Sequence, residues 1–206
     1  MKKHILFLFT LLLGACGQSP IQEYHYETNP EYVWGYQEFY GDYYSRYDIT
    51  NNVSTLSLFS ETLDVTKDGY LTGYGQHLNL YDIFTAVSDT VLPGGTYTAS
   101  DSNEPFTFMP GKYIERGNEK YITGAWIYYY EINNNKSGRK LITDGYFEIN
   151  WLMDGLYFEC NFITDDGKEL KGRIKSYPLT VFDESSKNTT GPEEVRPLVY
   201  RNIKKK

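Results

Sequence analysis

Residues 141–164 read LITDGYFEINWLMDGLYFECNFIT, and this stretch decides the fold. Apolar and polar side chains alternate along it on both sides of Asp154-Gly155. Alternation with a period of two is typical of a strand that buries one face, and Asp-Gly tolerates the positive φ angles of a tight hairpin turn. The stretch therefore predicts two antiparallel strands, whose inward faces carry Phe147, Ile149, Trp151 and Met153 on the first, and Leu156, Phe158, Cys160 and Phe162 on the second.

Two further runs extend this hairpin in both directions along the chain. Residues 125–132 precede it across Asn133-Asn134-Asn135, and residues 168–177 follow it across Asp166-Gly167. Asn and Asp-Gly at both connections favour short turns between neighbouring strands. The C-terminal half is therefore predicted to be an antiparallel meander with one buried face.

The N-terminal half shows shorter strand patterns separated by Gly and Pro. No window gives a long amphipathic helix, because Gly or Asn interrupts each candidate. The sequence thus predicts an all-β domain, an antiparallel sandwich or barrel of about 8–10 short strands, and leaves those two architectures open. The additional predicted strands cover residues 36–47, 53–60, 77–85, 96–99 and 106–108.

The first residues resemble an export signal that ends at a cysteine. Lys2 and Lys3 precede an apolar run over residues 5–13, which is shorter than the ~20 residues that span a bilayer. The run ends in Leu-Gly-Ala-Cys at residues 13–16, the pattern of a bacterial lipobox. We expect cleavage before Cys16 and acyl chains on its thiol, which would hold the protein to a membrane. The alternative is an ordinary signal peptide in which Cys16 merely lies near the cleavage site.

These features divide the chain into four predicted parts. Residues 1–15 form the lipoprotein signal peptide, and residues 16–35 form a lipidated N-terminus and tether that contains Pro20 and Pro30. Residues 36–183 form a single all-β domain, and residues 184–206 form a polar, flexible tail.

Charge and cysteine content narrow the classes of partner. The chain has 27 acidic residues against 20 Lys and Arg, which argues against binding nucleic acid or docking electrostatically on anionic lipid. Because Cys16 is expected to be acylated, Cys160 is left without a partner for an intrachain disulfide. Its place in an alternating strand indicates a buried structural thiol and not a nucleophile.

Signatures of catalysis are missing from the sequence. No G-x-S-x-G, H-E-x-x-H or C-x-x-C motif occurs, and neither His25 nor His77 is placed as a convincing base. We therefore expect no enzymatic activity and no cofactor. Asp64 and Asp68 begin a stretch that is similar to a calcium loop, but Gly75 occupies the position that requires a bidentate Glu, which favours a polar hairpin turn.

Tyrosine-rich stretches are the remaining candidates for a binding site. Trp126, Tyr128 and Tyr130 share one face of a predicted strand, and Tyr40 and Tyr44 lie in another aromatic stretch. Exposed, these rings would offer flat surfaces on which the C–H faces of sugars stack. The competing interpretation, which the high strand preference of tyrosine favours, uses them as packing between sheets or as cross-strand pairs.

Three motifs resemble those of a broad group of lipoproteins of the Bacteroidetes. They are the lipobox, the turn-strand LPGGTYT at residues 92–98, and the hairpin TDDGKELKG at residues 164–172. The resemblance loosely covers residues 36–180. It implies an all-β domain in the cell envelope at the outer membrane, with glycan capture or fimbria-like adhesion among its neighbours' roles, and assigns no functional residue. The neutral residues 17–20 leave the periplasmic or surface face of that membrane open.

Together these observations predict a lipid-anchored, non-catalytic binding module for a glycan or another surface ligand. The alternative is a structural or adhesive surface component that contacts other proteins through an edge strand. A hydrolase would need two acidic residues that face each other in a cleft.

Overall fold

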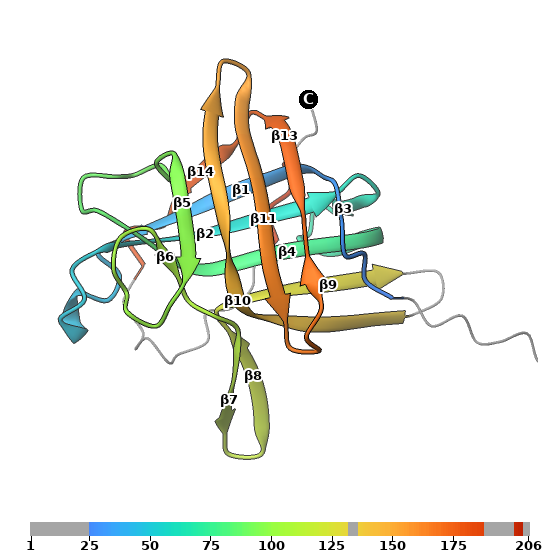
Figure 1. Ribbon diagram of the computed structural model, residues 1–206, viewed down its shortest axis with the longest axis horizontal. Coiled ribbons are helices and arrows are strands. Elements are labelled where there is room, and N and C mark those ends of the chain that lie inside the picture. The colour runs from blue at the N-terminus through green and yellow to red at the C-terminus, as the bar shows by residue number, and fades with distance from the viewer. Residues whose placement is uncertain (1–24, 132–135, 188–199, 204–206) are drawn as a thin grey trace, which may run out of the picture.

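The computed structural model describes residues 25–131, 136–187 and 200–203 (Figure 1). Cys16 and the predicted signal peptide lie outside these residues. The described chain confirms the all-β prediction, since its one helical element is a 3₁₀ turn at Ser45–Tyr47. It contains no helix long and apolar enough to cross a membrane. The strands are β1 Tyr32–Gly41, β2 Asn52–Ser60, β3 Leu63–Val65, β4 Leu71–Thr85, β5 Gly95–Ala99, β6 Thr107–Phe108, β7 Lys112–Arg116, β8 Glu119–Thr123, β9 Ala125–Glu131, β10 Lys136–Leu152, β11 Gly155–Thr164, β12 Glu169–Leu170, β13 Arg173–Tyr177 and β14 Thr180–Asp183.

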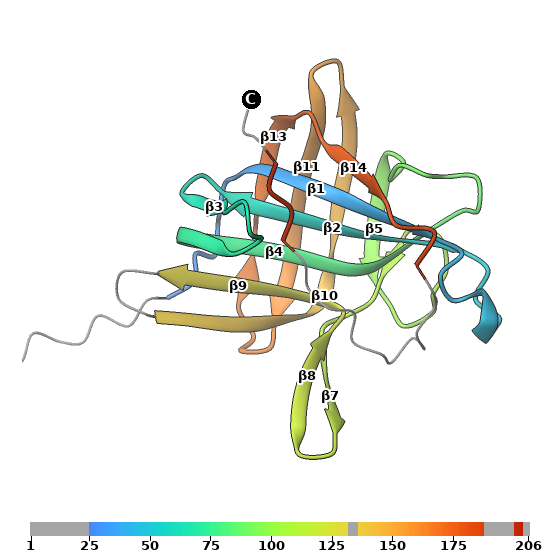
Figure 2. The ribbon, with the colours of Figure 1, turned by 180° about the vertical axis from the view of Figure 1, so that it is seen from behind.

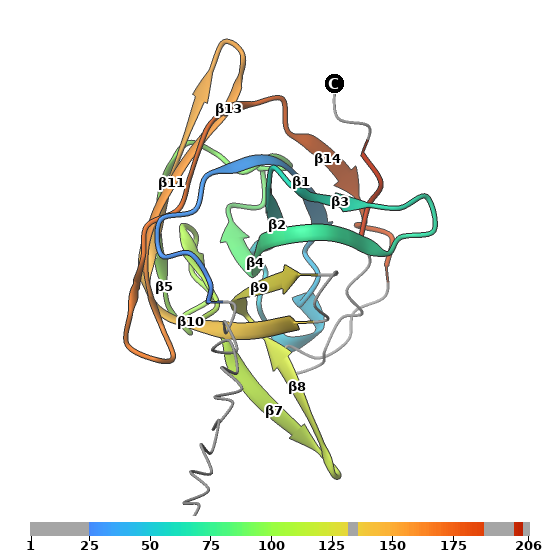
Figure 3. The same ribbon diagram turned by 90° about the vertical axis from the view of Figure 1, so that its right-hand side faces the viewer.

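The main sheet curls into a closed, barrel-like shape. Neighbouring strands follow the order β1-β2-β4-β9-β10-β11-β13. Strand β13 lies beside the residues that precede β1, where the Arg173 N–H donates to the Pro30 carbonyl at 3.1 Å, and this contact closes the sheet. Strand β14 continues this closure by pairing with β1, with Tyr36 opposite Thr180. Figure 3 shows these strands surrounding a common interior. The β1–β14 pair is parallel, as is β5–β6, so the sheet is mixed and not purely antiparallel.

The predicted meander forms from the antiparallel strands β9, β10 and β11, and its predicted fourth run is divided into β12 and β13, which both pair with β11. Phe147 lies opposite Cys160, and both face the interior. The turn glycines at 155 and 167 adopt the positive φ angles of 138° and 78° that their Asp-Gly sequences predict. The inward face ends at Ile149, however. Trp151 and Met153 are exposed because the β10–β11 hairpin extends beyond the body of the sheet (Figure 1).

The interior is filled mainly by aromatic and branched aliphatic side chains. Phe147 lies at its centre, stacked on Tyr97 with ring centroids 4.7 Å apart. Phe108, Phe158 and Phe162 surround the same ring. Because these residues come from β5, β6, β10 and β11, a single packed cluster joins the two halves of the chain.

The folded domain begins earlier than residue 36, the predicted boundary. Strand β1 starts at Tyr32, and Tyr26 is buried in the interior cluster. The Tyr26 hydroxyl donates to Asp166 Oδ1 at 2.8 Å and lies 3.0 Å from Thr164 Oγ1. Burial raises the pKa of Tyr26 to about 12, so this hydroxyl remains a donor at neutral pH. The proline residues of this segment favour a tether, but its tyrosines pack into the interior cluster and make it part of the domain.

The predicted flexible tail also contains a packed segment. Tyr200 and Ile203 lie against a second apolar cluster on the outer face of β1 and β2, beside Trp34, Tyr36 and Phe59. Figure 2 shows this short segment crossing that face. The Arg201 guanidinium pairs with Glu38 and Glu184, so an ion-pair network holds the segment in place. Its sequence is polar, and its apolar residues are too few to show periodicity.

Candidate functional site

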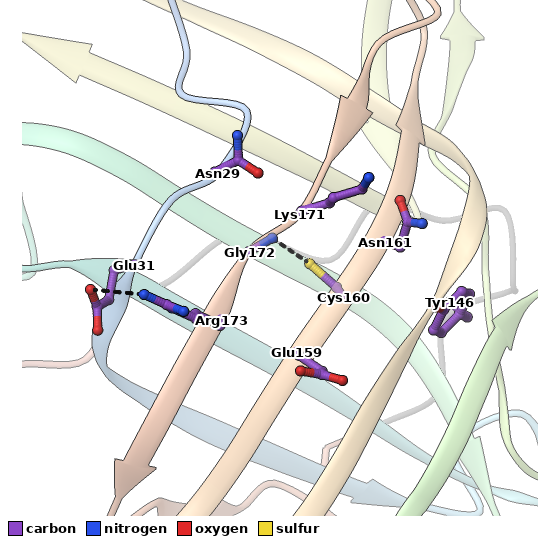
Figure 4. Close-up of a pocket in the computed structure, with 9 residues that line it drawn as sticks. All are labelled: Asn29, Glu31, Tyr146, Glu159, Cys160, Asn161, Lys171, Gly172 and Arg173. Carbon is purple, nitrogen blue, oxygen red and sulfur yellow. Dashed lines mark hydrogen bonds and ion pairs between the residues drawn. The ribbon is translucent and has the colours of Figure 1, made fainter.

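A hollow lies on the outer face of β11 and β13, where the chain leading into β1 passes beside them (Figure 4). Its volume is about 520 Å³. It is lined by Asn29, Glu31, Tyr146, Glu159, Cys160, Asn161, Lys171, Gly172 and Arg173.

Strand alternation explains which side chains reach the hollow. Phe158, Cys160 and Phe162 belong to the interior cluster, so Glu159 and Asn161 point to the opposite side of β11. Tyr146 stands opposite Asn161 across the β10–β11 pair, and Arg173 stands opposite Glu159 across β11–β13. The outward, polar face of the meander thus supplies most of the residues that line the hollow.

The floor of the hollow is structural. The Gly172 N–H donates to Cys160 Sγ at 3.2 Å, and burial raises the pKa of the thiol well above its usual range. A thiol held neutral in this way is a poor nucleophile, as the sequence predicts. Gly172 is required here, because a Cβ at this position would come within 2.6 Å of the Tyr32 ring.

The rim carries charges of both signs that are paired with each other. Arg173 and Lys175 each lie 3.8 Å from the Glu31 carboxylate, and Lys171 Nζ lies 2.6 Å from Glu169. Figure 4 shows Arg173 directed toward Glu31, away from the side of the hollow that carries Tyr146 and Asn161. The charged groups therefore form a balanced border, in which Lys171 extends toward Asn161 while its ammonium pairs with Glu169.

Two neutral groups lie on that side, an exposed tyrosine ring and an amide whose oxygen lacks a donor. The Tyr146 side chain is 45% exposed, so its ring presents a face to solvent. Asn161 Oδ1 is buried and makes no hydrogen bond within the described structure. A buried acceptor without a donor costs about 1–3 kcal/mol, and a bound donor would recover this free energy. An aromatic face beside an unpaired amide oxygen suits a ligand that is apolar on one side and rich in hydroxyls on the other.

Two carboxylates also face each other on this surface. Glu148 and Glu159 lie directly opposite across β10 and β11. Glu159 accepts a hydrogen bond from the Tyr157 hydroxyl at 2.6 Å, and Glu148 accepts one from Asn150 Nδ2 at 2.8 Å. Their strands present them on the outside of the sheet, and only Glu159 lines the hollow, so the two carboxylates do not flank one cleft as glycoside hydrolysis requires.

The structure does not place the predicted aromatic residues on an open platform. Tyr40 and Tyr44 are buried around Tyr43, with both ring pairs edge to face, and the Tyr44 hydroxyl donates to Asp82 Oδ2 at 3.0 Å. Trp126 is only 4% exposed. The predicted alternation along β9 is confirmed, since Ala125 and Ile127 join the interior cluster and Tyr129 packs against it.

Tyr128 and Tyr130 are half-buried and belong to a row of rings across the sheet. Their ring centroids lie 5.6 Å apart, and the Arg139 guanidinium lies 5.4 Å from the Tyr128 ring. Register places Trp34, Phe59, His77, Tyr128 and Arg139 side by side on five consecutive strands. The structural interpretation therefore accounts for most of this cluster, as cross-strand pairs that stabilise the sheet.

His77 is the centre of that row and is fully buried. Its ring stacks on Phe59 with centroids 4.3 Å apart, and Trp126 meets it edge-on. Burial lowers the pKa of His77 to about 3, and neither ring nitrogen has a hydrogen-bond partner in the described structure. A histidine that is neutral and shielded from solvent cannot serve as a general base for an external substrate.

The calcium-loop stretch is a β-hairpin. Asp64 lies in β3, which pairs with the start of β4, and Asp64 Oδ1 accepts a hydrogen bond from the Val65 N–H at 2.8 Å. Asp68 is exposed in the turn. The described residues contain no group of three or more acidic, His or Cys side chains that could hold a metal ion.

The hollow could not be predicted from the sequence because one wall of it, Asn29 and Glu31, lies more than 100 residues before the others. The remaining lining residues belong to the predicted meander, but only the parallel bridge between Glu31 and Arg173 shows that the chain before β1 passes beside them. The sequence matches no family model, no curated protein and no solved structure.

Proposed function

We propose that this protein is a lipid-anchored module of the bacterial cell envelope, at the outer membrane, that binds glycans through the hollow beside β11. The observation that carries the glycan assignment is the half-exposed Tyr146 ring opposite Asn161, whose amide oxygen lacks a donor. A sugar ring would stack its C–H face on Tyr146 and donate a hydroxyl to Asn161. No catalysis, cofactor or nucleic acid enters this proposal.

The balanced rim supports a neutral or weakly charged saccharide. Glu31 is already shared by Arg173 and Lys175, and Lys171 is engaged by Glu169. A strongly anionic ligand would have to compete with these carboxylates for the same cations. Asn29 adds a second amide to the lining, and amides donate and accept as hydroxyl groups require.

Replacing Tyr146 by Ala is expected to weaken glycan binding by about tenfold, which corresponds to about 1.4 kcal/mol, because it removes the stacking surface. A glycan array identifies the ligand of the parent protein, and titration calorimetry with that ligand measures the change. Tyr113→Ala is the matched control, because Tyr113 is equally exposed but lies on a separate hairpin. Absence of any glycan bound by the parent, or equal weakening by both variants, would remove the glycan assignment.

Replacing Cys16 by Ser is expected to abolish lipid incorporation and to release the protein from the membrane fraction. The thiol is the proposed site of acylation, and ~0.8 kcal/mol per buried methylene accounts for stable anchoring by more than one chain. Metabolic labelling with a fatty acid and detergent phase partitioning measure the two effects. Cys160→Ser serves as the control, because its thiol is buried in the fold. Unchanged labelling of the Cys16 variant would refute the lipobox.

The second candidate is a structural or adhesive component that engages other proteins. A two-stranded ribbon formed by β7 and β8 favours it, because this ribbon pairs with no other described strand. Unpaired strand edges are templates for another chain.

A further inference from the structure

The β7–β8 ribbon stands apart from the body of the protein. Its two strands form their own sheet, and both outer edges are unpaired among the described residues. Figures 1 and 3 show the ribbon projecting away from the main sheet. An isolated two-stranded hairpin is marginally stable in water, and exposed edges promote pairing with another chain. Pairing with a further strand would therefore stabilise a ribbon of this kind.

Both faces of the ribbon carry large apolar side chains that the body does not bury. On one face Ile114 lies opposite Tyr121, and on the other Tyr113 lies opposite Ile122. Tyr113 is 51% exposed, and Ile114, Tyr121 and Ile122 are only partly buried, so the ribbon carries apolar surface that a wider sheet would pack beside further side chains.

We infer that β8 pairs with β8 of a second copy of this chain, in an antiparallel arrangement with the two-fold axis at Tyr121. The ribbons then form one four-stranded sheet in the order β7-β8-β8-β7. Tyr121 lies opposite Tyr121 of the partner subunit, and Ile114 flanks this pair on both sides. A continuous apolar row thus crosses four strands, where each separate ribbon holds only half of it.

Charge selects the β8 edge over the β7 edge. Antiparallel pairing of β8 about Tyr121 places Lys120 opposite Ile122 of the partner subunit, and Glu119 opposite Thr123 of the partner subunit. No like charges lie directly opposite each other in this arrangement. The same operation on β7, centred on Ile114, places Lys112 opposite Arg116 of the partner subunit, which is destabilising.

The size of the main sheet favours a closed, two-fold β8–β8 dimer over an open, repeating stack in which β8 of one copy pairs with β7 of the next. The β8 edge also matches the β7 edge of another copy in charge, as Lys120 and Glu115 do within one ribbon at 3.3 Å. Repeated β8–β7 pairing, however, would orient all ribbons in the same direction and would place successive copies of the chain only two strands, or roughly 9.6 Å, apart. The closed main sheet is much wider than this, so neighbouring bodies would overlap. Two-fold pairing points the ribbons in opposite directions and places the bodies at opposite ends.

Cysteine cross-linking tests the two-fold axis directly. In a chain carrying Cys16→Ser, Tyr121→Cys is expected to give a disulfide-linked dimer on a non-reducing gel, because directly opposite Cβ atoms lie about 4.5–5.5 Å apart. Ile114→Cys is the matched control, since its two copies lie three strand spacings apart, about 14 Å. Cys160 is buried and does not interfere. A cross-link at Ile114→Cys alone, or equal cross-linking of both variants, would overturn the β8 pairing.

Sedimentation velocity of the same chain without added cysteines supplies an independent readout. We expect a concentration-dependent monomer–dimer equilibrium that shifts toward monomer in Ile122→Lys, which places a second lysine opposite Lys120 of the partner subunit. Tyr113→Lys changes the same face of the ribbon on the strand far from the axis and is expected to leave the equilibrium nearly unchanged. A monomer at every concentration, or equal shifts by both variants, would refute the proposal. Glycan binding at the hollow is measured separately and does not depend on this outcome.

Discussion

Replacing Phe147 by Ala is expected to lower the free energy of unfolding by about 3–5 kcal/mol. The ring is fully buried and touches four other aromatic rings, Tyr97 at 4.7 Å, Phe108 at 5.4 Å, Phe158 at 5.5 Å and Phe162 at 6.4 Å between centroids. These neighbours come from rigid strands that cannot collapse into the space, so the cost includes a cavity as well as lost burial. The loss is a large part of the stability of a typical domain.

Tyr146→Ala is the matched control for this prediction. Tyr146 precedes Phe147 on the same strand but faces the outside, so its truncation is expected to change stability by less than about 0.5 kcal/mol. Urea denaturation followed by intrinsic fluorescence measures both variants. Similar losses in the two would contradict the assignment of inward and outward faces, and would also weaken Tyr146→Ala as a test of binding.

Replacing Arg201 by Met is expected to lower the free energy of unfolding by about 3 kcal/mol. The guanidinium donates from Nε and Nη2 to one oxygen of Glu38, at 3.0 and 2.9 Å, contacts Glu184, and lies over the Phe182 ring. Glu38 is buried, so removing its cation leaves a carboxylate without its charge partner. Met keeps most of the packing volume, which isolates the electrostatic part of the loss.

The companion variant Glu38→Gln separates the ion pair from other effects of Arg201→Met. In the double variant no buried carboxylate remains at position 38, so we expect its stability to exceed that of Arg201→Met alone. Limited proteolysis checks whether the segment at Tyr200 is released. A stability change below about 0.5 kcal/mol for Arg201→Met would show that the ion pair behaves like an exposed surface pair.

The meander could be predicted from the sequence because its determinants are local. Alternation along β11 and the Asp-Gly pairs at both of its ends fix which residues face inward and where the chain turns. The same reasoning correctly assigned Cys160 to the interior. Only the hairpin tip differs from the prediction. The alternation continues through Trp151, but the sheet against which Trp151 would pack has already ended there, so its side chain is exposed.

The closure of the sheet could not be predicted, because it depends on pairs of residues that are distant in sequence. No local pattern shows that Arg173 meets Glu31, or that Arg201 reaches Glu38. Both contacts bring short polar segments to the outer surface of the main sheet. The contact of Arg201 also explains why β4 carries a buried group on the side that reads as polar, since it holds the segment in which Tyr200 meets the His77 ring edge-on. The hollow, which this closure creates, was hidden for the same reason.

The closure also sets the order in which the protein can fold. Strand β1 is the first strand in the chain, yet its parallel partner β14 is the last of the described strands. Contacts between distant residues are slow to form, because a long intervening loop must first be ordered. Folding can therefore begin in local hairpins such as β1–β2 and β10–β11, but the sheet cannot be completed until β14 is in place. Delayed completion of this kind leaves the side of β1 that pairs with β14 open until late in folding, and makes it the edge that needs protection from premature pairing.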